Sequence, residues 1–179
     1  MPEIEIRPAV PADLPVLAGL GHSYETQYVW QMDRNVEDGQ TLVNFREVRL
    51  PRSVKVDYPY ARTVLADEWG QQAVVMVAVI GSEAVGYLRI KDRLIPNTAW
   101  VTDLVVKPQL RRQGIASGLI LAGQDWSAQR GLRRFMLEMQ SKNYPAICLA
   151  RKLRFEFSGY HDHFYANQDI ALFFSRFLR

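Results

Sequence analysis

The chain has 179 residues, 48% of them hydrophobic, and a formal net charge of +3. This length and apolar content fit a single domain over residues 1–179. The small charge and the absence of any block of five like charges argue against a nucleic-acid partner. A single cysteine, Cys148, excludes an internal disulfide and suits a reducing compartment. The acidic start is unlike a signal peptide, and no apolar run approaches the roughly 20 residues of a membrane span, so we expect a cytoplasmic protein with no membrane partner.

The first part of the chain, up to residue 70, contains short regular segments and one irregular region. Ile4 and Ile6 alternate with charged residues, as in a strand, and Pro11 suits the first turn of a helix. The irregular region has two extended segments around the turn NVEDGQ, which predicts a hairpin; ordered connections of this length are often functional. In chain order, we expect a strand at 3–7, a helix at 11–20, a hairpin-like insert at about 22–60 with strands at 28–32 and 41–50, and a short helix at 61–69.

The second part is more regular. The apolar run QAVVMVAVI predicts a buried strand, a Gly-Ser turn leads back into EAVGYLRIK, and Gly131 suits the end of a helix. This part is expected to contain strands at 72–80, 83–91 and 100–106, a helix at 113–129, a strand at 133–139, a helix at 143–153, and strands at 155–165 and 170–177. This order predicts an α/β (α+β) fold with one mixed, mostly antiparallel central sheet flanked by helices.

Residues 100–126 contain a strand, a glycine-bearing turn and a helix in succession. The Val-rich strand ends at Pro108, because proline cannot donate to a sheet ladder. The first turn of a helix carries unpaired N–H groups and the positive end of the helix dipole, so it favours anions. Gly114 would let a diphosphate approach the backbone, and Arg111 and Arg112 add charged donors. The alternative is an ordinary strand-to-helix connection with a solvated basic turn.

Two common phosphate motifs, GxxxxGK[ST] and GxGxxG, are missing, which disfavours a P-loop NTPase and a dinucleotide-binding domain. The turn instead contains R-x-x-G-x-A, at Arg111, Gly114 and Ala116, after a strand that ends in VVKP. In this context the motif resembles the acetyl-CoA-binding motif of the GNAT superfamily of N-acetyltransferases. The segment Asn143–Ala146 is similar to that family's N-x-x-A helix start, and residues 137–155 resemble its streptothricin-acetyltransferase-like branch.

The resemblance implies an acyl-CoA N-acyltransferase (GNAT) fold and direct transfer of an acetyl group from acetyl-CoA, as co-substrate, to a primary amine of a small molecule or peptide. Strands 100–106 and 133–139 would splay apart, and the pantetheine arm would pair with the backbone of Leu104 and Val106. The Val105 N–H would polarise the thioester carbonyl. The residues implied to bind the co-substrate are Leu104, Val105, Val106, Arg111, Arg112, Gln113, Gly114, Ile115, Ala116, Ser117 and Asn143. The alternative is a catalytically silent acyl-CoA-binding regulatory or sensor domain.

Two carboxylates are candidates for the catalytic base. An alkylammonium has a pKa of about 10, so some group must take its proton before attack. Asp103 is the first candidate, because strand alternation predicts that Val101, Asp103 and Val105 share one face. Glu138, on the adjacent strand, is the second. Either carboxylate can instead serve a structural hydrogen bond or ion pair.

One position departs from the family pattern. Ala150 stands where the resemblance places a tyrosine that protonates the leaving thiolate, and alanine cannot transfer a proton. Tyr144 and Tyr160 are therefore catalytic candidates, with Tyr165 or a water as alternatives, unless the thiolate leaves unaided. Each tyrosine can instead serve packing. Ala150 also favours the silent sensor.

The acceptor site is the least determined part. Tyr28, Trp30 and Asp33 are candidates for acceptor binding, because aromatic faces and a carboxylate suit a cationic amine; the same residues can form a small second core under the insert. His161 and His163 would share a strand face, but no other Cys or His cluster accompanies them, so we expect no metal. The sequence leaves a homodimer and a monomer both open.

Overall fold

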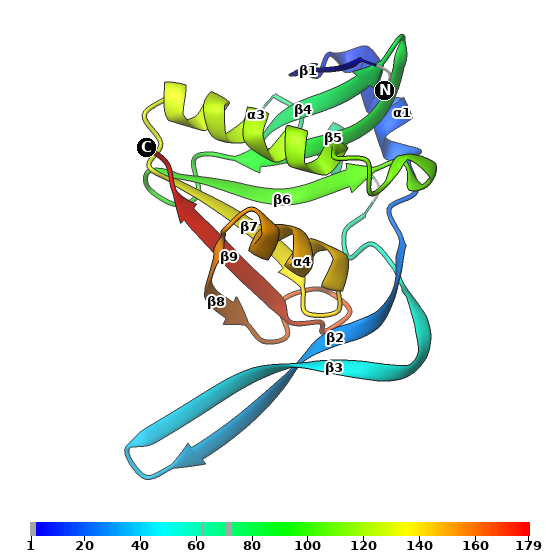
Figure 1. The fold of residues 1–179 in the computed structure, drawn as a ribbon. Coiled ribbons are helices and arrows are strands. Elements are labelled where there is room, and N and C mark those ends of the chain that lie inside the picture. The colour runs from blue at the N-terminus through cyan, green and yellow to red at the C-terminus, as the bar shows by residue number, and fades with distance from the viewer. Residues whose placement is uncertain (1–2, 62, 71–72) are drawn as a thin grey trace.

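The structure is a computed structural model that describes residues 3–61, 63–70 and 73–179. Within these residues, seven strands form one mixed sheet in the order β1-β4-β5-β6-β7-β9-β8, and two more form a separate hairpin, β2-β3 (Figure 1). The strands are β1 (Ile4–Pro8), β2 (Tyr24–Glu37), β3 (Gln40–Val56), β4 (Ala73–Ile80), β5 (Glu83–Lys91), β6 (Thr98–Val106), β7 (Arg134–Gln140), β8 (Glu156–His161) and β9 (Ala171–Phe177). The helices are α1 (Leu14–Ala18), α2 (Val64–Asp67), α3 (Ile115–Gln129) and α4 (Tyr144–Lys152).

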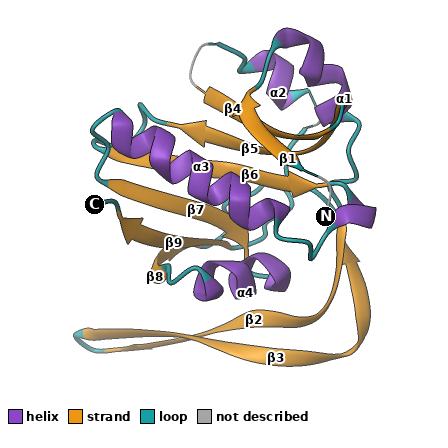
Figure 2. Ribbon diagram, turned by 45° about the horizontal axis from the view of Figure 1, so that its top comes forward, coloured by secondary structure: helices purple, strands orange, loops and turns teal. Residues whose placement is uncertain are grey.

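Helices cover both faces of the large sheet. α3 and α4 lie on one face (Figure 2), over the main core, which includes the fully buried Leu88 and Phe135. α3 approaches the sheet closely because Gly123 has no side chain: a Cβ there would lie 2.5 Å from Leu88 Cδ2. A second core, around Val77 and Tyr87, packs against α1 and α2. The predicted mixed, mostly antiparallel sheet flanked by helices is confirmed.

β6 and β7 are neighbours for only part of their length. They pair in parallel where Thr98–Val101 runs beside Arg134–Leu137, and the described ladder between them stops there. The remaining part of β6 still pairs with β5 on its other side. The predicted splay is therefore confirmed, and it leaves one edge of β6 with backbone N–H and C=O groups that face no strand.

A β-bulge in β6 lies next to this point. Val101 and Asp103 pair with adjacent residues of β5, so Thr102 is an extra residue in β6. The bulge reverses the alternation of side chains, and Val101 lies in the core beside α3 whereas Val105 lies in the core beside α1 and α2. The prediction that Val101, Asp103 and Val105 share one face was therefore wrong for Val101.

The hairpin β2-β3 forms a long arm that projects from the body (Figure 1). Both strands are longer than predicted, and they meet at a tight turn after Glu37. The base of the arm is fixed to the body, because the Trp30 N–H donates to the Ser141 carbonyl at 2.9 Å. The arm leads directly into the loop 57–61, which reaches the central sheet.

Other differences from the sequence expectations concern element ends. The expected helix at 11–20 is a 3-10 turn followed by α1, and the expected helix at 61–69 is the short α2, with residue 62 outside the described residues. β8 ends at His161, and His163 lies in the following turn with φ +50°, so the two histidines do not share a strand face. None of the described helices is long and apolar enough to cross a membrane.

Candidate active site

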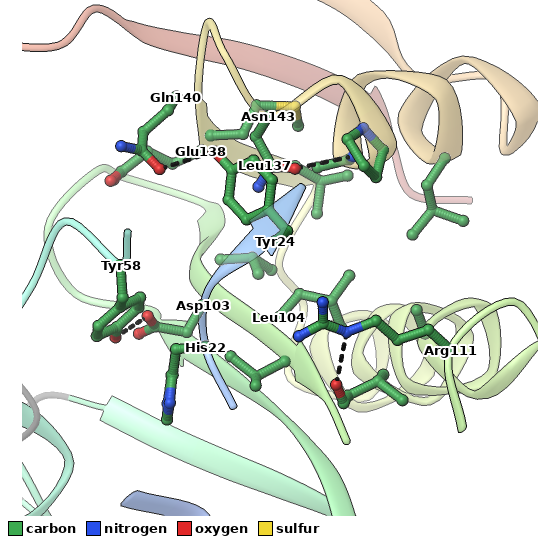
Figure 3. A pocket seen from close by; sticks show the side chains of 18 of the residues that line it. His22, Tyr24, Tyr58, Asp103, Leu104, Arg111, Leu137, Glu138, Gln140 and Asn143 are labelled. Atoms are coloured by element: carbon green, nitrogen blue, oxygen red, sulfur yellow. Dashed lines mark hydrogen bonds between the residues drawn. The ribbon is translucent and has the colours of Figure 1, made fainter. Parts of the chain in front are cut away.

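A cavity of about 510 Å³ lies where β6 and β7 part (Figure 3). Its walls come from segments far apart in the chain: the start of β2, the loop after β3, β6, the first turn of α3, β7 and α4. Small-molecule sites typically have this size and a mixed apolar and polar lining. The splay of the two strands therefore creates a ligand-sized space through the middle of the sheet.

The start of α3 presents bare backbone to this cavity. Gly114 has φ +88°, a conformation that glycine adopts without strain, and nothing lies within 4 Å of the position that its Cβ would take. The Gly118 N–H donates to the Gly114 carbonyl at 3.0 Å, so the N–H groups of Ile115, Ala116 and Ser117 have no acceptor within the helix. With the positive end of the helix dipole, this cradle suits a phosphate group.

The two arginines of the preceding turn are used differently. Arg111 donates to three carbonyl groups, those of Gly21 at 2.6 Å and of Ser23 and Val106 at 3.0 Å each. It thereby fixes the chain before β2 against the end of β6. Arg112 is exposed at the cavity wall and has φ +67°. Arg111 thus supports the cradle, whereas Arg112 presents its charge to the opening.

The backbone of β6 alternates between its two sides. The Lys107 N–H donates to the Val85 carbonyl at 2.8 Å, so in this antiparallel ladder the Val105 N–H also points towards β5. Leu104 and Val106 direct their backbone groups to the other side, where β7 has diverged. This register agrees with the expected backbone pairing at Leu104 and Val106. It does not leave Val105 as a donor to the cavity, which corrects that prediction.

α4 forms the wall opposite the cradle. Asn143 caps this helix, because its Oδ1 accepts from the Ala146 N–H at 3.2 Å. Cys148 and Lys152 line the cavity. Ala150 is fully buried in the main core and lies outside the lining, so the side chain at this position faces away from the ligand space.

Asp103 is held in a buried ion pair. Its Oδ2 contacts Arg89 Nε, and the two side chains are 0% and 1% exposed. The Tyr58 hydroxyl donates to Oδ1 of Asp103, and Figure 3 shows these two side chains next to each other. The Thr102 hydroxyl donates to Oδ2 at 3.3 Å. Arg89 also contacts Glu68 at 2.7 Å. Both oxygens of Asp103 are therefore occupied by groups of the protein.

Glu138 is different, because no cation pairs with it among the described residues. The hydroxyls of Tyr60 and Tyr165 both donate to Oε1, Tyr165 at 3.0 Å. Oε2 has no hydrogen-bond partner in the described chain; the Trp100 indole N–H favours the carboxylate but falls short of hydrogen-bond geometry. Burial raises the pKa of Glu138 to about 7, the charge of Asp103 adds to the rise, and the two tyrosine hydrogen bonds oppose it.

A further polar chain lies beyond Glu138 on the same strand. The Tyr24 hydroxyl donates to Gln140 Oε1 at 3.0 Å, and Gln140 Nε2 donates to Asp169 at 2.9 Å. Lys142 pairs with the other oxygen of Asp169 at 2.5 Å. Tyr24 and Gln140 face the cavity (Figure 3), so this network fixes the start of β2 and the end of β7 as one wall.

The cavity lining contains charged residues of both signs. Figure 3 shows Asp103 and Tyr58 across the cavity from Arg111, whereas Lys152 belongs to α4, on the wall opposite the cradle. The acidic lining residues are Glu25, Asp103 and Glu138, and the basic ones are Arg111, Arg112 and Lys152. Because Arg89 already compensates Asp103, the other negative charges of the lining come from Glu25 and Glu138.

The three residues expected to bind the acceptor lie on β2, in the arm, outside the lining. Trp30 packs against Phe174, with ring centroids 5.6 Å apart. Asp33 is exposed and pairs with Arg46 at 2.7 Å. Tyr28 faces α4 instead of the cavity. Trp30 and Tyr28 thus have packing roles, in line with the alternative of apolar packing under the insert, whereas Asp33 belongs to no core.

Three other predicted residues also lie outside the lining. The Tyr144 ring is 5.1 Å from that of Tyr28, and the Tyr160 ring is 5.2 Å from that of Phe45. Gln113 is exposed in the turn before α3. The cavity thus contains Asp103, Glu138 and Asn143 but neither Tyr144 nor Tyr160.

The sequence reasoning missed Tyr58 and Tyr60 as site residues. Both belong to the segment VDYPY, which joins the arm to the body. The only local signal was two tyrosines around Pro59 in an irregular segment. Arg89 gave no signal either, because it stands in an otherwise apolar strand and its partner is distant in sequence.

Within the described part of the chain, no group of three or more His, Cys, Asp or Glu side chains could hold a metal ion.

Comparisons with known proteins agree with this architecture. The model of the acetyltransferase (GNAT) family matches residues 42–155. Streptothricin acetyltransferase of Streptomyces lavendulae is 29% identical over 172 residues, which cover 87% of this chain and 82% of that protein.

Two solved structures share the fold. Nourseothricin acetyltransferase superposes with a TM-score of 0.83 at 20% identity, covering 98% of this chain and 99% of its own. A Bacillus anthracis protein described as a candidate streptothricin acetyltransferase, solved with acetyl coenzyme A, gives 0.78 at 17% identity, covering 99% of this chain and 98% of its own.

Proposed function

Because the chain belongs to the acetyltransferase (GNAT) family and is an N-acetyltransferase that uses acetyl-CoA, we propose that it acetylates a primary amine of a small cationic molecule. The observation that carries this proposal is one cavity with bare helix N–H groups at one end and the carboxylates of Asp103 and Glu138 at the other. An anionic co-substrate and a cationic acceptor would enter such a cavity from opposite ends. The name of the streptothricin acetyltransferase relative supports a small molecule over a peptide.

The cradle end would hold acetyl-CoA. Two features support the fit of its phosphates in the cradle. The space around Gly114 is open, and the N–H groups of Ile115, Ala116 and Ser117 lack acceptors in α3. Leu104 and Val106 would pair through their backbone with the pantetheine arm, as a missing strand does, and one of their N–H groups would polarise the thioester carbonyl in place of Val105.

At the acidic end, Glu138 would take the proton of the acceptor. A base works best when its pKa lies near the operating pH, and burial brings the pKa of Glu138 to about 7. Asp103 is the weaker candidate, because Arg89, Tyr58 and Thr102 already occupy its oxygens. The ammonium N–H bond breaks and an O–H bond forms on Glu138; the neutral nitrogen then attacks the thioester carbon.

The leaving thiolate would receive no proton from a side chain. Ala150 faces the core, and Tyr144 and Tyr160 lie outside the cavity. The Tyr165 hydroxyl already donates a hydrogen bond to Glu138. The C–S bond would therefore break to release the thiolate directly, or with a water as acid. The extra proton on the new amide nitrogen would pass to that thiolate or to water.

The test combines two measurements on the full chain. Calorimetric titration with acetyl-CoA measures binding, and thiol release over a panel of amines measures transfer; the panel includes streptothricin, lysine-like diamines and peptides with a free N-terminus. We expect rapid thiol release with cationic small molecules and little with peptides. Binding of acetyl-CoA without acceptor-dependent thiol release from any amine would instead support the silent sensor, which Ala150 favours.

A further inference from the structure

Tyr60 and Tyr165 reach the same oxygen of Glu138 from two separate segments. Tyr60 belongs to the loop after β3, and Tyr165 to the loop between β8 and β9. Both hydroxyls donate to Oε1, Tyr165 at 3.0 Å, and the two rings meet edge to face with centroids 5.6 Å apart. Two neighbouring hydroxyls therefore converge on one carboxylate oxygen and leave the other oxygen without a hydrogen bond in the described chain.

On balance, the surroundings of Glu138 favour the neutral acid. The side chain is buried, and the negative charge of Asp103 on β6 is close enough to raise the pKa further. The groups that oppose this are the Tyr60 and Tyr165 hydroxyls and, more weakly, the indole N–H of Trp100 on β6. Since no ion pair among the described residues includes Glu138, the two tyrosines are its main stabilising partners when it is charged.

We propose that Tyr60 and Tyr165 are positioning residues that act through Glu138: they hold its carboxylate by Oε1 in one orientation and keep it charged so that it can accept the proton of the acceptor amine. This inference rests on the proposed role of Glu138 as base. The tyrosines keep their own protons throughout; the only proton that moves goes from the ammonium to Glu138. Tyr60 also links Glu138 to the arm, because its loop follows β3 directly.

The chain offers a matched set of variants. Tyr60→Phe removes one hydroxyl and keeps the ring that packs against Tyr165. Tyr58→Phe is the control, because Tyr58 lies in the same loop and makes the same kind of hydrogen bond, but to Asp103. Tyr165→Phe is a second variant, which removes the other hydroxyl that donates to Glu138 Oε1. Tyr165 is the more buried of the two donors.

The experiment measures the charge of Glu138 in two ways. Carboxyl-labelled glutamate NMR follows its titration in the protein without substrates, with Glu138→Gln to assign the signal. The pH profile of kcat/KM, from about pH 5.5 to 9, reports the ionised base in turnover. For the unaltered protein we expect both midpoints at about 7.

The sign follows from the hydrogen bond. A donor to a carboxylate stabilises the charged form and lowers the pKa, so Tyr60→Phe should raise both midpoints by about one pH unit. Tyr165→Phe should shift them in the same direction, and Tyr58→Phe should leave both in place, whatever it does to the size of kcat/KM.

The outcomes separate this inference from the function that it builds on. If Tyr60→Phe and Tyr165→Phe leave the NMR midpoint unchanged, or if Tyr58→Phe shifts it equally, the inference is overturned. A shift in the NMR midpoint without a shift in the kinetic profile supports the tyrosine effect on Glu138 but overturns its role as base. Parallel shifts in both measurements support the two together.

Discussion

The two ends of the cavity are built in different ways. The cradle end consists of consecutive backbone groups at the start of α3, made accessible by Gly114. The acidic end consists of side chains on β6 and β7, held by hydroxyls from two loops. A ligand's phosphates can be bound by main-chain N–H groups alone, whereas recognition of one amine requires side chains of chosen shape and charge. The end that we propose for the common co-substrate is therefore local in sequence, and the end that we propose for the acceptor is dispersed.

The largest expected effect concerns the acidic end alone. Glu138→Gln keeps the shape of the side chain but cannot accept a proton, so kcat/KM should fall by about 10²- to 10⁴-fold, the usual contribution of a general base. Thiol release measures this loss, and calorimetry should show acetyl-CoA binding unchanged. Full activity of this variant across the pH range would contradict the assignment and return Asp103 to first place.

A second change tests whether Asp103 is structural. Arg89→Met leaves Asp103 as a buried charge without its partner, which should lower the free energy of unfolding by about 3–5 kcal/mol. Chemical denaturation measures this change. The double variant with Asp103→Asn should recover most of the loss, because both charges are then absent; no recovery would show that Arg89 acts through some other contact.

A third change affects the cradle end. Gly114→Val forces a β-branched residue to φ +88° and places its side chain in the open space of the cradle. The strain of about 1–2 kcal/mol lowers stability. The side chain occupies the space of the phosphates, so the Kd for acetyl-CoA should rise by roughly tenfold or more. Gly131→Val is the matched control, since Gly131 has φ +75° and open space at the far end of α3. It should lower stability but leave the Kd unchanged; an equal change in Kd would argue against the cradle.

The smallest effect should come from the rim. Arg112 is exposed, and exposed ion pairs contribute little, so Arg112→Ala should weaken acetyl-CoA binding by roughly twofold to fivefold. The effect should shrink as salt is added, because salt screens exposed charges. Arg130→Ala, at the other end of α3, is the control for a general loss of positive charge.

The same contrast explains what the sequence could predict. The strand, turn and helix around Gly114 are consecutive, and their roles follow from backbone chemistry, so the order of elements and the cradle were accessible. The acidic end depends on pairs that are distant in the chain: Tyr58 and Asp103 are 45 positions apart, and Tyr60 and Glu138 are 78 apart. No local pattern indicates such contacts.

The Val105 prediction failed for a different reason. The direction of a backbone N–H depends on which neighbouring strand a residue is bonded to, and this is set by the register between β5 and β6. The bulge at Thr102 also changed which face Val101 occupies. Periodicity assumes an uninterrupted strand, so it cannot anticipate a single inserted residue.

The parting of β6 and β7 has a consequence for the lifetime of the protein. Where the two strands diverge, main-chain groups of β6 lack a strand partner, and a ligand that fills this gap completes the sheet. Binding to the native state alone adds about 2.7 kcal/mol of stability when the ligand is present at about 100 times its Kd. The resistance of this enzyme to heat and proteases would therefore rise and fall with the acetyl-CoA supply of the cell, and a thermal-melt series over acetyl-CoA concentration would record that dependence.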